Sequence, residues 1–531
     1  MNELNTDVLL DEEAMSKLVK GVKLLAKMVG STLGPRAKSV AIDQDYTYRV
    51  VDDGVIVARA INLKDKFEEL GVKIARESAQ KVVDTTGDGT SATIVLLSGI
   101  VDEAMKVISS GVNPMRLRVE IEQAAKKVLT SLSKIKQSIT SKEQKIQVAT
   151  ISCKDTELGK LIADTIIKIG DGGIITVEES KMPDTVVEMQ DGMQFERGYA
   201  HPFMITEPER MVAVLEDVHV LISDIPLTNL VDIGKFLENQ VLAKGVVKMV
   251  FIVPEVGGDF LSAMLGAKIN GKFLGLVVKN PMVGSHATEF LQDLCAMTGA
   301  KLVSKEAGHK FEDIDLTWCG KIGRIVSTKV STTITKGGGL RDDVLQRIQV
   351  IKEQMKDETL SDFDKEKLKE RLAKLTKGVA VLKIGGETEV EMKERKERAI
   401  DAVMACQSAV KHGIVPGGEI AFLMASSVLK DSSILGEQIL YHALKKPFKQ
   451  LTENAGFDSG EMLNEFNHRK GEGLDVTDGI WKDMVKEGIV DPYDCPETAI
   501  KVAVSCAVQL MTVGGAIVPI EDAKVSNLPQ K

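Results

Sequence analysis

The residues best suited to chemistry in this sequence lie at 82–97, where the chain reads VVDTTGDGTSATIVLL. The tetrapeptide GDGT at 87–90 falls at the junction of two helix-like segments. Its glycines would let backbone N–H groups approach a phosphate while Asp88 holds a magnesium ion. No Gly-Lys-Ser/Thr follows, and no GxGxxG follows a strand, which excludes P-loop and Rossmann sites. The segment predicts a nucleotide site of another type; the alternative is a glycine turn that only caps a helix at Thr90.

Several other segments accompany this tetrapeptide along the chain. They are STLGP at 31–35, VDDGV at 51–55, GMQFERGY at 192–199, GVAVLKIGG from 378 with TEVEMKER up to 395, VPGG at 415–418, GIVDP at 488–492, and an acidic and apolar helix pair between 341 and 377. In this order the set resembles the GroEL-type group I chaperonins, from about Leu10 to Pro529. The chain resembles a divergent member, because it stops at LPQK without the Gly-Gly-Met tail.

The resemblance implies a multidomain α+β/α fold. A mainly helical equatorial ATPase domain would comprise residues 1–134 and 412–531, and a small intermediate domain would comprise 135–190 and 379–411. An α/β apical polypeptide-binding domain at 191–378 would be inserted in the middle of the chain. The residue pattern agrees with an insertion, because helical segments at both ends enclose an α/β block. The length of 531 residues suits about two to four domains.

The periodicity of apolar residues locates the main elements. Apolar positions recur at intervals of three and four from Asp11 to Val29, which predicts a helix ended by Gly30. Runs rich in β-forming residues follow at 176–225, and helices then alternate with buried strands up to Thr298. The other expected helices are 66–84, 92–111, 114–138, 142–151, 230–242, 258–269, 288–298 and a hairpin at 341–377, with mostly helix from 389 to about 511.

Composition and charge exclude several classes of function. The net charge is −9 and cationic residues are mixed with acidic ones, so no basic stripe predicts a nucleic-acid partner. The longest apolar runs, such as 246–253, are too short to span a membrane, and MNELNTDVLLDEE at the N-terminus lacks the pattern of a signal peptide. Six scattered cysteines without metal spacing suit a reducing compartment, so we expect a cytoplasmic protein.

The resemblance also implies an ATPase site with ATP and Mg²⁺ as cofactors. Asp88 would be the magnesium ligand, Asp53 would face the γ-phosphate, and Asp401 would orient the attacking water. Thr32 marks the position of an optional K⁺. Without the resemblance, Asp401 would be an ordinary helix-surface acid and Asp491 a helix N-cap. The nucleotide-binding positions implied are Thr32, Leu33, Gly34, Pro35, Asp53, Gly54, Asp88, Gly89, Thr90, Ser91, Ile151, Ser152, Gly417, Gly418, Asp475, Ile489 and Asp491.

Three departures from the family pattern lie in this set. Asp52 stands where the family has a lysine, Ala92 where it has a third hydroxyl after GDG, and Asp475 where it has an asparagine beside the adenine. An extra carboxylate and a lost hydroxyl predict weaker contacts with phosphate or cation. We also expect two hinges between Asp88 and Asp401, so that hydrolysis waits for domain closure.

A polypeptide-binding surface is implied on the apical domain at Tyr199, His201, Phe203, Met204, Leu237, Leu261 and Leu265, with Ile233, Phe236, Phe260 and Met264 expected to add apolar area nearby. Exposed apolar surface attracts unfolded chains without sequence preference. The alternative, strongest for Leu237 and Leu265, is that these residues form an apical core. Gly234 and Gly266 replace two aliphatic positions of the same surface. In the family this surface also receives a lid-forming co-chaperonin, so we expect such a lid to bind weakly or not at all.

The leading hypothesis is an ATP-driven ring chaperonin that captures unfolded polypeptides on apolar apical surfaces and encloses them for folding. Its partners would be unfolded clients and further copies of the chain in a sevenfold ring. The resemblance does not decide between a single ring and two stacked rings. The alternative is a ring-forming holdase or scaffold with weak ATPase activity, which the departures at Asp52, Ala92, Gly234 and Gly266 leave open. A small-molecule kinase fits the GDGT segment but not the apical insertion.

Overall fold

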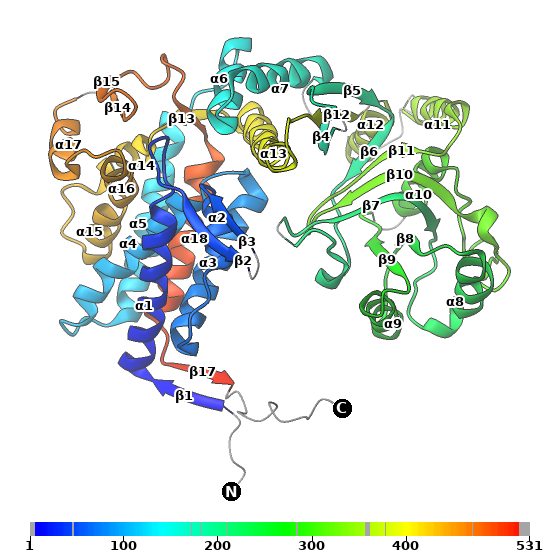
Figure 1. The fold of residues 1–531 in the computed structure, drawn as a ribbon, viewed down its shortest axis with the longest axis horizontal. Helices are drawn as coiled ribbons and strands as arrows, with labels where there is room; N and C mark the ends of the chain where they lie inside the picture. The colour runs from blue at the N-terminus through cyan, green and yellow to red at the C-terminus, as the bar shows by residue number, and fades with distance from the viewer. Residues whose placement is uncertain are drawn as a thin grey trace, which may run out of the picture. The chain divides into compact units, whose positions relative to one another are not determined.

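A computed structural model describes residues 6–44, 47–170, 173–180, 182–208, 210–282, 285–355, 362–376, 379–469 and 471–519. The chain divides into two compact units, one made of 1–167 with 393–531 and the other of 168–392 (Figure 1). The second unit is inserted between two segments of the first, so the two ends of the chain build one unit together. The domain boundaries near 134, 190 and 411 stay predictions. The boundary at Gly378 and the C-terminal LPQK lie outside the described residues.

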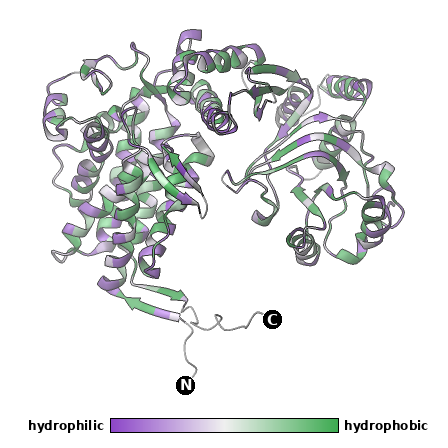
Figure 2. Ribbon diagram, in the orientation of Figure 1, coloured by the Kyte–Doolittle hydropathy of each residue, from purple (hydrophilic) through white to green (hydrophobic). Residues whose placement is uncertain are grey.

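The first unit is built around long helices that share one apolar core. Hydrophobic and hydrophilic residues alternate along these helices (Figure 2), as expected of amphipathic helices that bury one face. α4 is the exception, because most of its residues are buried. These helices are α1 (Asp11–Gly30), α3 (Lys66–Thr86), α4 (Thr90–Ile108), α5 (Pro114–Ile135) and α18 (Asp494–Met511).

Short strand pairs and smaller helices complete this unit. β1 (Thr6–Leu10) pairs antiparallel with β17 (Gly515–Pro519), which ties the two ends of the described chain together. β2 (Val40–Gln44) and β3 (Thr47–Val51) form a hairpin before α2 (Gly54–Ala60). The other elements are α6 (Lys142–Cys153), α7 (Thr156–Ile169), α13 (Glu389–His412), β13 (Ile414–Pro416), α14 (Ile420–Ser426), α15 (Leu435–Ala443), α16 (Lys446–Asn454), α17 (Ser459–Phe466), β14 (Gly473–Asp475), β15 (Ile480–Lys482) and β16 (Val490–Pro492).

The second unit contains a six-stranded mixed sheet of order β6-β11-β10-β7-β8-β9. β7, β8 and β9 run parallel, and the other neighbours are antiparallel. The strands are β6 (Gly192–Phe195), β7 (Ala213–Ile222), β8 (Lys248–Val253), β9 (Leu274–Lys279), β10 (Gly320–Ser327) and β11 (Thr332–Gly337). The helices that follow the parallel strands are α8 (Leu230–Phe236), which continues as a π-helical turn at Leu237–Val241, α9 (Gly258–Ile269) and α10 (Ser285–Thr298).

A smaller three-stranded sheet lies where the chain enters and leaves this unit. β12 (Val379–Ile384) pairs parallel with β4 (Ile174–Glu179) and antiparallel with β5 (Val186–Gln190). β12 follows the helical hairpin of α11 (Arg341–Gln354) and α12 (Asp362–Thr376).

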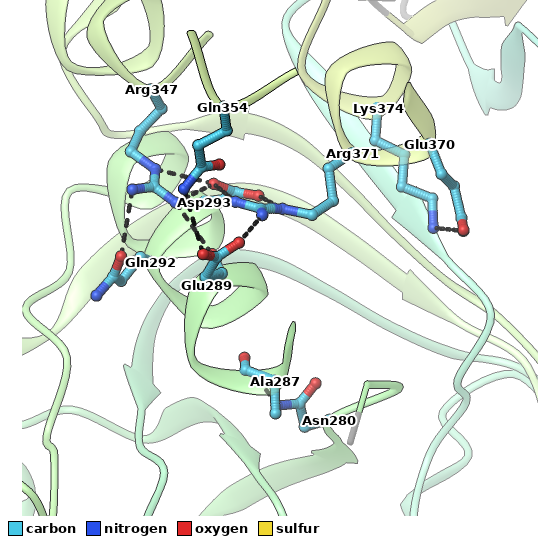
Figure 3. A network of polar contacts seen from close by, with 10 residues as sticks. All are labelled: Asn280, Ala287, Glu289, Gln292, Asp293, Arg347, Gln354, Glu370, Arg371 and Lys374. Carbon is cyan, nitrogen blue, oxygen red and sulfur yellow. Dashed lines mark hydrogen bonds and ion pairs between the residues drawn. The ribbon is translucent and has the colours of Figure 1, made fainter. Parts of the chain in front are cut away.

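A buried charge network fixes this hairpin to α10 (Figure 3). Asp293 of α10 accepts hydrogen bonds from Arg371 Nε at 2.7 Å and Nη2 at 3.0 Å, and from Arg347 Nε at 2.9 Å. The side chains of Arg371 and Asp293 are each only 1% exposed. A buried charge is tolerated when it is paired and hydrogen-bonded, so this network specifies how the hairpin docks.

The architecture confirms the predicted multidomain α+β fold. The helix predicted at 258–269 has the bounds of α9, and the one predicted at 11–29 is one residue shorter than α1. Within the described residues, no helix is both long and apolar enough to cross a membrane. All six cysteines are free thiols.

Candidate functional site

The GDGT loop joins α3 to α4, at the helix junction that the sequence predicts. Gly87 (φ 73°) and Gly89 (φ 89°) both adopt the left-handed conformation that favours glycine. The first turn of α4 contains no acidic residue, so its unpaired N–H groups and its dipole favour an anion. Asp88 Oδ1 accepts a hydrogen bond from Gly89 N–H at 2.6 Å, and no described residue donates to Oδ2. The loop therefore offers amide donors for a phosphate beside a carboxylate oxygen for a cation.

Two hydroxyls and a glycine meet beside this loop. Thr32 Oγ1 and Ser91 Oγ are 3.2 Å apart. A Cβ added to Gly54 would lie 2.3 Å from Ser91 Oγ and 3.3 Å from Thr32 Oγ1, so a larger residue at 54 would disturb this pair. The structure thus brings together three segments that are far apart in sequence, 31–35, 51–55 and 87–91.

The 31–35 segment is held by α16. Asn454 Nδ2 donates to Gly30 O at 2.8 Å and to Leu33 O at 2.9 Å. A Cβ on Gly34 (φ 92°) would lie 2.2 Å from Leu451 Cδ1. Pro35, the last residue of the segment, is exposed. Sequence reasoning missed Asn454, because nothing in its local pattern distinguishes this helix-end amide from a solvated one.

Asp53 serves as the N-cap of α2. Its Oδ1 accepts from Val55 N–H at 3.0 Å and its Oδ2 from Ile56 N–H at 3.2 Å. Desolvation by the surrounding protein raises the pKa of Asp53 despite these two bonds, and the charge of Glu397 raises it further. The carboxylate predicted to face the γ-phosphate is therefore positioned by the helix it caps.

A strand pair assembles the second half of the site. β13 and β16 place Val415 opposite Asp491, and Gly417 N–H donates to Ile489 O at 2.9 Å. Gly418 (φ 67°) follows directly. Predicted residues from 417–418 and 489–491, which are about seventy positions apart in sequence, therefore lie side by side.

Desolvation and the charges of nearby carboxyl groups raise the pKa values of Asp491, Glu419 and Asp88 here. Desolvation, together with the charge of Asp88, raises the pKa of Asp491 to about 7. Desolvation and the charges of Asp491 and Asp88 raise the pKa of Glu419 well above its usual value. Desolvation and the charge of Asp53 raise the pKa of Asp88 too, although Asp88 reaches solvent. The charges of these carboxyl groups disfavour a further anion, so a nucleotide would require cations alongside it.

Glu419 was missed by sequence reasoning. It adopts φ 64°, which is uncommon for a residue other than glycine and marks a strained position. An acidic residue immediately after the VPGG turn was the available signal.

Asp401 lies on α13, and this helix packs against the GDGT loop. A Cβ added to Gly87 would lie 2.6 Å from Met404 Cβ and 3.4 Å from the carbonyl oxygen of Asp401. Asp401 and Asp88 also belong to the same compact unit. In this conformation α13 is docked on the loop, and the hinges predicted between the two acids stay a prediction.

The remaining predicted positions differ in their surroundings. Ile151 and Ser152 lie in the last turn of α6, where Ile151 is exposed. The carboxylate of Asp475 accepts from Thr477 N–H at 2.9 Å and from Lys482 Nζ at 2.9 Å, and these partners hold its pKa below the usual value despite partial desolvation. The structure thus uses Asp475 to fix the β14–β15 hairpin.

The side chains of the site suit a magnesium ion that is held mainly by the phosphates of a bound nucleotide. Among the described residues, no group of three or more His, Cys, Asp or Glu side chains could hold a metal ion. Mg²⁺ commonly uses one or two carboxylates together with substrate phosphates and water. Asp88 Oδ2, beside the amides of α4, fits that arrangement.

The predicted polypeptide-binding residues are only partly on the surface. Phe203 is 64% exposed and stacks on His201, and Leu261 and Leu265 are partly exposed. Tyr199, Met204 and Leu237 are buried in the core of the second unit, so their predicted exposure is wrong in this conformation. Tyr199 and Met204 are buried because segment 199–204 pairs with the edge strand β9. There the Ala200 N–H donates a backbone hydrogen bond to Val277 O. The residues predicted to add apolar surface for clients, Ile233, Phe236, Phe260 and Met264, are buried in the same core and do not add it in this conformation.

Comparison with known proteins gives consistent matches. The family model of the TCP-1/cpn60 chaperonin family matches residues 25–236 and 261–520. The unmatched interval begins at the π-helical turn after α8 and ends within α9. Among solved structures, the fold is similar to the chaperonin gp146 from the bacteriophage EL 2 (Pseudomonas aeruginosa), crystallised in presence of ATP-BeFx. One crystal form has a TM-score of 0.66 and 20% sequence identity, covering 96% of this chain and 99% of that one. A second crystal form has a TM-score of 0.61 at the same identity and coverage.

Proposed function

This chain belongs to the TCP-1/cpn60 chaperonin family, and on that premise we propose that it is an ATP-driven ring chaperonin that captures unfolded polypeptides and encloses them for folding. The observation that carries the proposal is the meeting of the GDGT loop, the Thr32–Ser91 pair and the Asp401 helix in one unit. A metabolic kinase would not require the inserted second unit with its exposed apolar residues.

The residues of the site divide the work of phosphoryl transfer. Asp88 Oδ2 would hold Mg²⁺, which neutralises charge on the phosphate oxygens. The N–H groups at the start of α4, with the hydroxyls of Thr32 and Ser91, would bind those oxygens, and K⁺ would be a second cation near Thr32. Asp401 would accept a hydrogen bond from the attacking water and so orient it.

The client surface follows from exposure. Phe203 at 64% and Ile269 at 82% are connected through Lys268, whose Nζ donates to Phe203 O at 2.6 Å. Val231 on α8 is 83% exposed, and Leu261 is partly exposed. Apolar residues exposed to this degree can bind unfolded chains without reading their sequence. We place the client surface on these residues.

The assembly would be a homo-oligomeric ring, sevenfold by the resemblance, with a weak or absent requirement for a lid protein. Free thiols are compatible with a reducing cytoplasm. We place the protein there.

The decisive test compares two carboxylate variants. Asp401→Ala should retain ATP binding and lower turnover by about 10²-fold, since it removes only the group that orients water. Asp88→Ala should instead lose magnesium-dependent ATP binding. Both are measured by equilibrium ATP binding and by phosphate release.

Glu122→Ala provides the control, because Glu122 lies on the exposed face of α5 in an ion pair with Arg118. It should leave both quantities unchanged. Parental turnover in Asp401→Ala would show that the water-orienting group lies elsewhere. Client capture by the wild-type chain without nucleotide-dependent enclosure would favour the holdase alternative.

A further inference from the structure

The candidate site is strongly acidic before any nucleotide enters. It contains four carboxyl groups, those of Asp53, Asp88, Glu419 and Asp491, with Asp53 held at the N-terminus of α2 and Asp491 in β16. A nucleoside triphosphate would add several negative charges, so at least one side-chain cation near the phosphates would favour binding. The residue before the acidic turn, Asp52, supplies a further carboxylate instead of a cation.

Lys154 supplies a side-chain cation beside Asp52. Its Nζ lies 2.9 Å from Asp52 Oδ2. Arg398 Nη2 lies 3.9 Å from the same oxygen. Although partial desolvation raises the pKa of Asp52, the Lys154 hydrogen bond and charge and the charge of Arg398 lower it below its usual value. Asp53 and Gly54, the next two residues after Asp52, belong to the site, since Gly54 lies against the Thr32–Ser91 hydroxyl pair.

The backbone at Lys154 is unusual. Lys154 is the residue after the last turn of α6 and adopts φ 55°, a position that glycine or asparagine commonly occupies. A lysine there carries backbone strain without gaining burial, because its side chain is 49% exposed. An exposed ion pair of this kind contributes little to stability. The strain is therefore better explained by a use for the ammonium group than by a structural role.

We propose that Lys154 donates to the terminal phosphate of bound ATP and that Asp52 is the positioning residue that holds its ammonium group at the site. This inference rests on the proposed ATPase function and deepens it. The two residues together restore the cation that position 52 lacks. The ammonium group would contact the γ-phosphate, which ADP lacks. The affinity for ATP should therefore depend on Lys154 more than the affinity for ADP does.

Lys154→Gly is the sharpest variant, because it removes the ammonium group and also relieves the left-handed backbone. It should weaken binding of an ATP analogue with a non-hydrolysable β,γ bond by about tenfold or more, while ADP binding changes by less than about threefold. Its melting temperature should equal or exceed that of the wild-type chain. Lys154→Arg should keep the preference for the analogue over ADP.

Two further variants separate charge from structure. Lys142→Ala is the matched control, since Lys142 begins the same helix segment, is also 49% exposed and pairs with Asp164 at 2.6 Å; it should change neither affinity. Asp52→Lys introduced into Lys154→Gly should recover affinity for the analogue by returning a cation to the neighbouring position.

The outcomes are distinguishable. If Lys154→Gly binds the analogue as tightly as the wild-type chain, or loses ADP and analogue affinity equally, the role of Lys154 is refuted while the ATPase proposal stands. If the wild-type chain binds neither nucleotide, both proposals fail. A selective loss of the analogue with an unchanged or higher melting temperature supports the inference.

Discussion

The contact between the GDGT loop and α13 makes a quantitative prediction at Gly87. A Cβ at this position would lie 2.6 Å from Met404 Cβ, whereas carbon atoms in contact lie about 3.5–4.0 Å apart. Gly87→Ala therefore forces the loop and α13 apart by about 1 Å. Because Asp401 lies one turn before Met404 on the same helix, the displacement moves the carboxylate that we propose to orient water away from the loop.

The expected effect falls on turnover rather than on binding. A misplacement of about 1 Å in a reacting group costs on the order of 10²-fold in rate. The left-handed backbone of an alanine at position 87 adds about 1–2 kcal/mol of strain. This strain lowers stability but does not affect turnover more than ATP binding. We expect Gly87→Ala to lower the rate of phosphate release by about 10²-fold and ATP affinity by less than about tenfold.

Three companion variants test this reasoning. Gly111→Ala carries the same strain, at φ 93°, but meets no atom within 4 Å, so its turnover should be unchanged. In the Gly87→Ala background, Met404→Gly removes the opposing Cβ and should recover turnover, whereas Met404→Ala keeps that Cβ and should not. Parental turnover in Gly87→Ala, or equal rescue by both Met404 variants, would refute the docking of α13 as the basis of hydrolysis.

Two more predictions concern the client surface and the acidic cluster. Phe203→Ser combined with Leu261→Ser should abolish capture of a denatured test protein and spare basal ATP hydrolysis; undiminished capture would place the clients elsewhere. Asp491→Asn tests the carboxyl whose pKa is raised from 3.8 to about 7. Because the folded-state pKa is the higher one, wild-type stability is greatest below the unfolded pKa and falls as the pH rises to about 7, by at most about 3 kcal/mol between pH 5 and 8. The asparagine cannot ionise, so melting temperatures of the nucleotide-free variant should fall less over that range than those of the wild-type chain, and an equal fall would contradict the assignment.

The long elements and the GDGT junction could be predicted from the sequence, because their signals are local. The apolar spacing of α1 and α9 and the two glycines at 87 and 89 each act through neighbours in the chain. α7 was not predicted, although its buried Leu158, Ile162 and Ile166 recur at helical spacing, so that signal was available.

Other features depend on partners that are distant in sequence. The strands β13 and β16 are three residues long, which is too short for a periodic pattern, and form only because they pair with each other. The burial of Tyr199 and Met204 requires the edge of β9, and the role of Asn454 requires the carbonyls of Gly30 and Leu33. No local property of these residues indicates such contacts.

The surroundings of Gly234 and Gly266 bear on whether a lid protein can bind the second unit. A Cβ at Gly234 or Gly266 would meet no atom within 4 Å, so each glycine leaves open space where an aliphatic side chain would stand. Ile233 and Met264 cannot fill that space from the surface, because both are buried in the core. Each missing aliphatic contact removes about 1.5–3 kcal/mol of burial, and a ring-shaped lid that binds every subunit loses this contribution many times over. An unfolded client needs only part of this surface, and the exposed Phe203 is still available to it. We therefore expect the exposed residues of the second unit to bind clients better than they bind a lid.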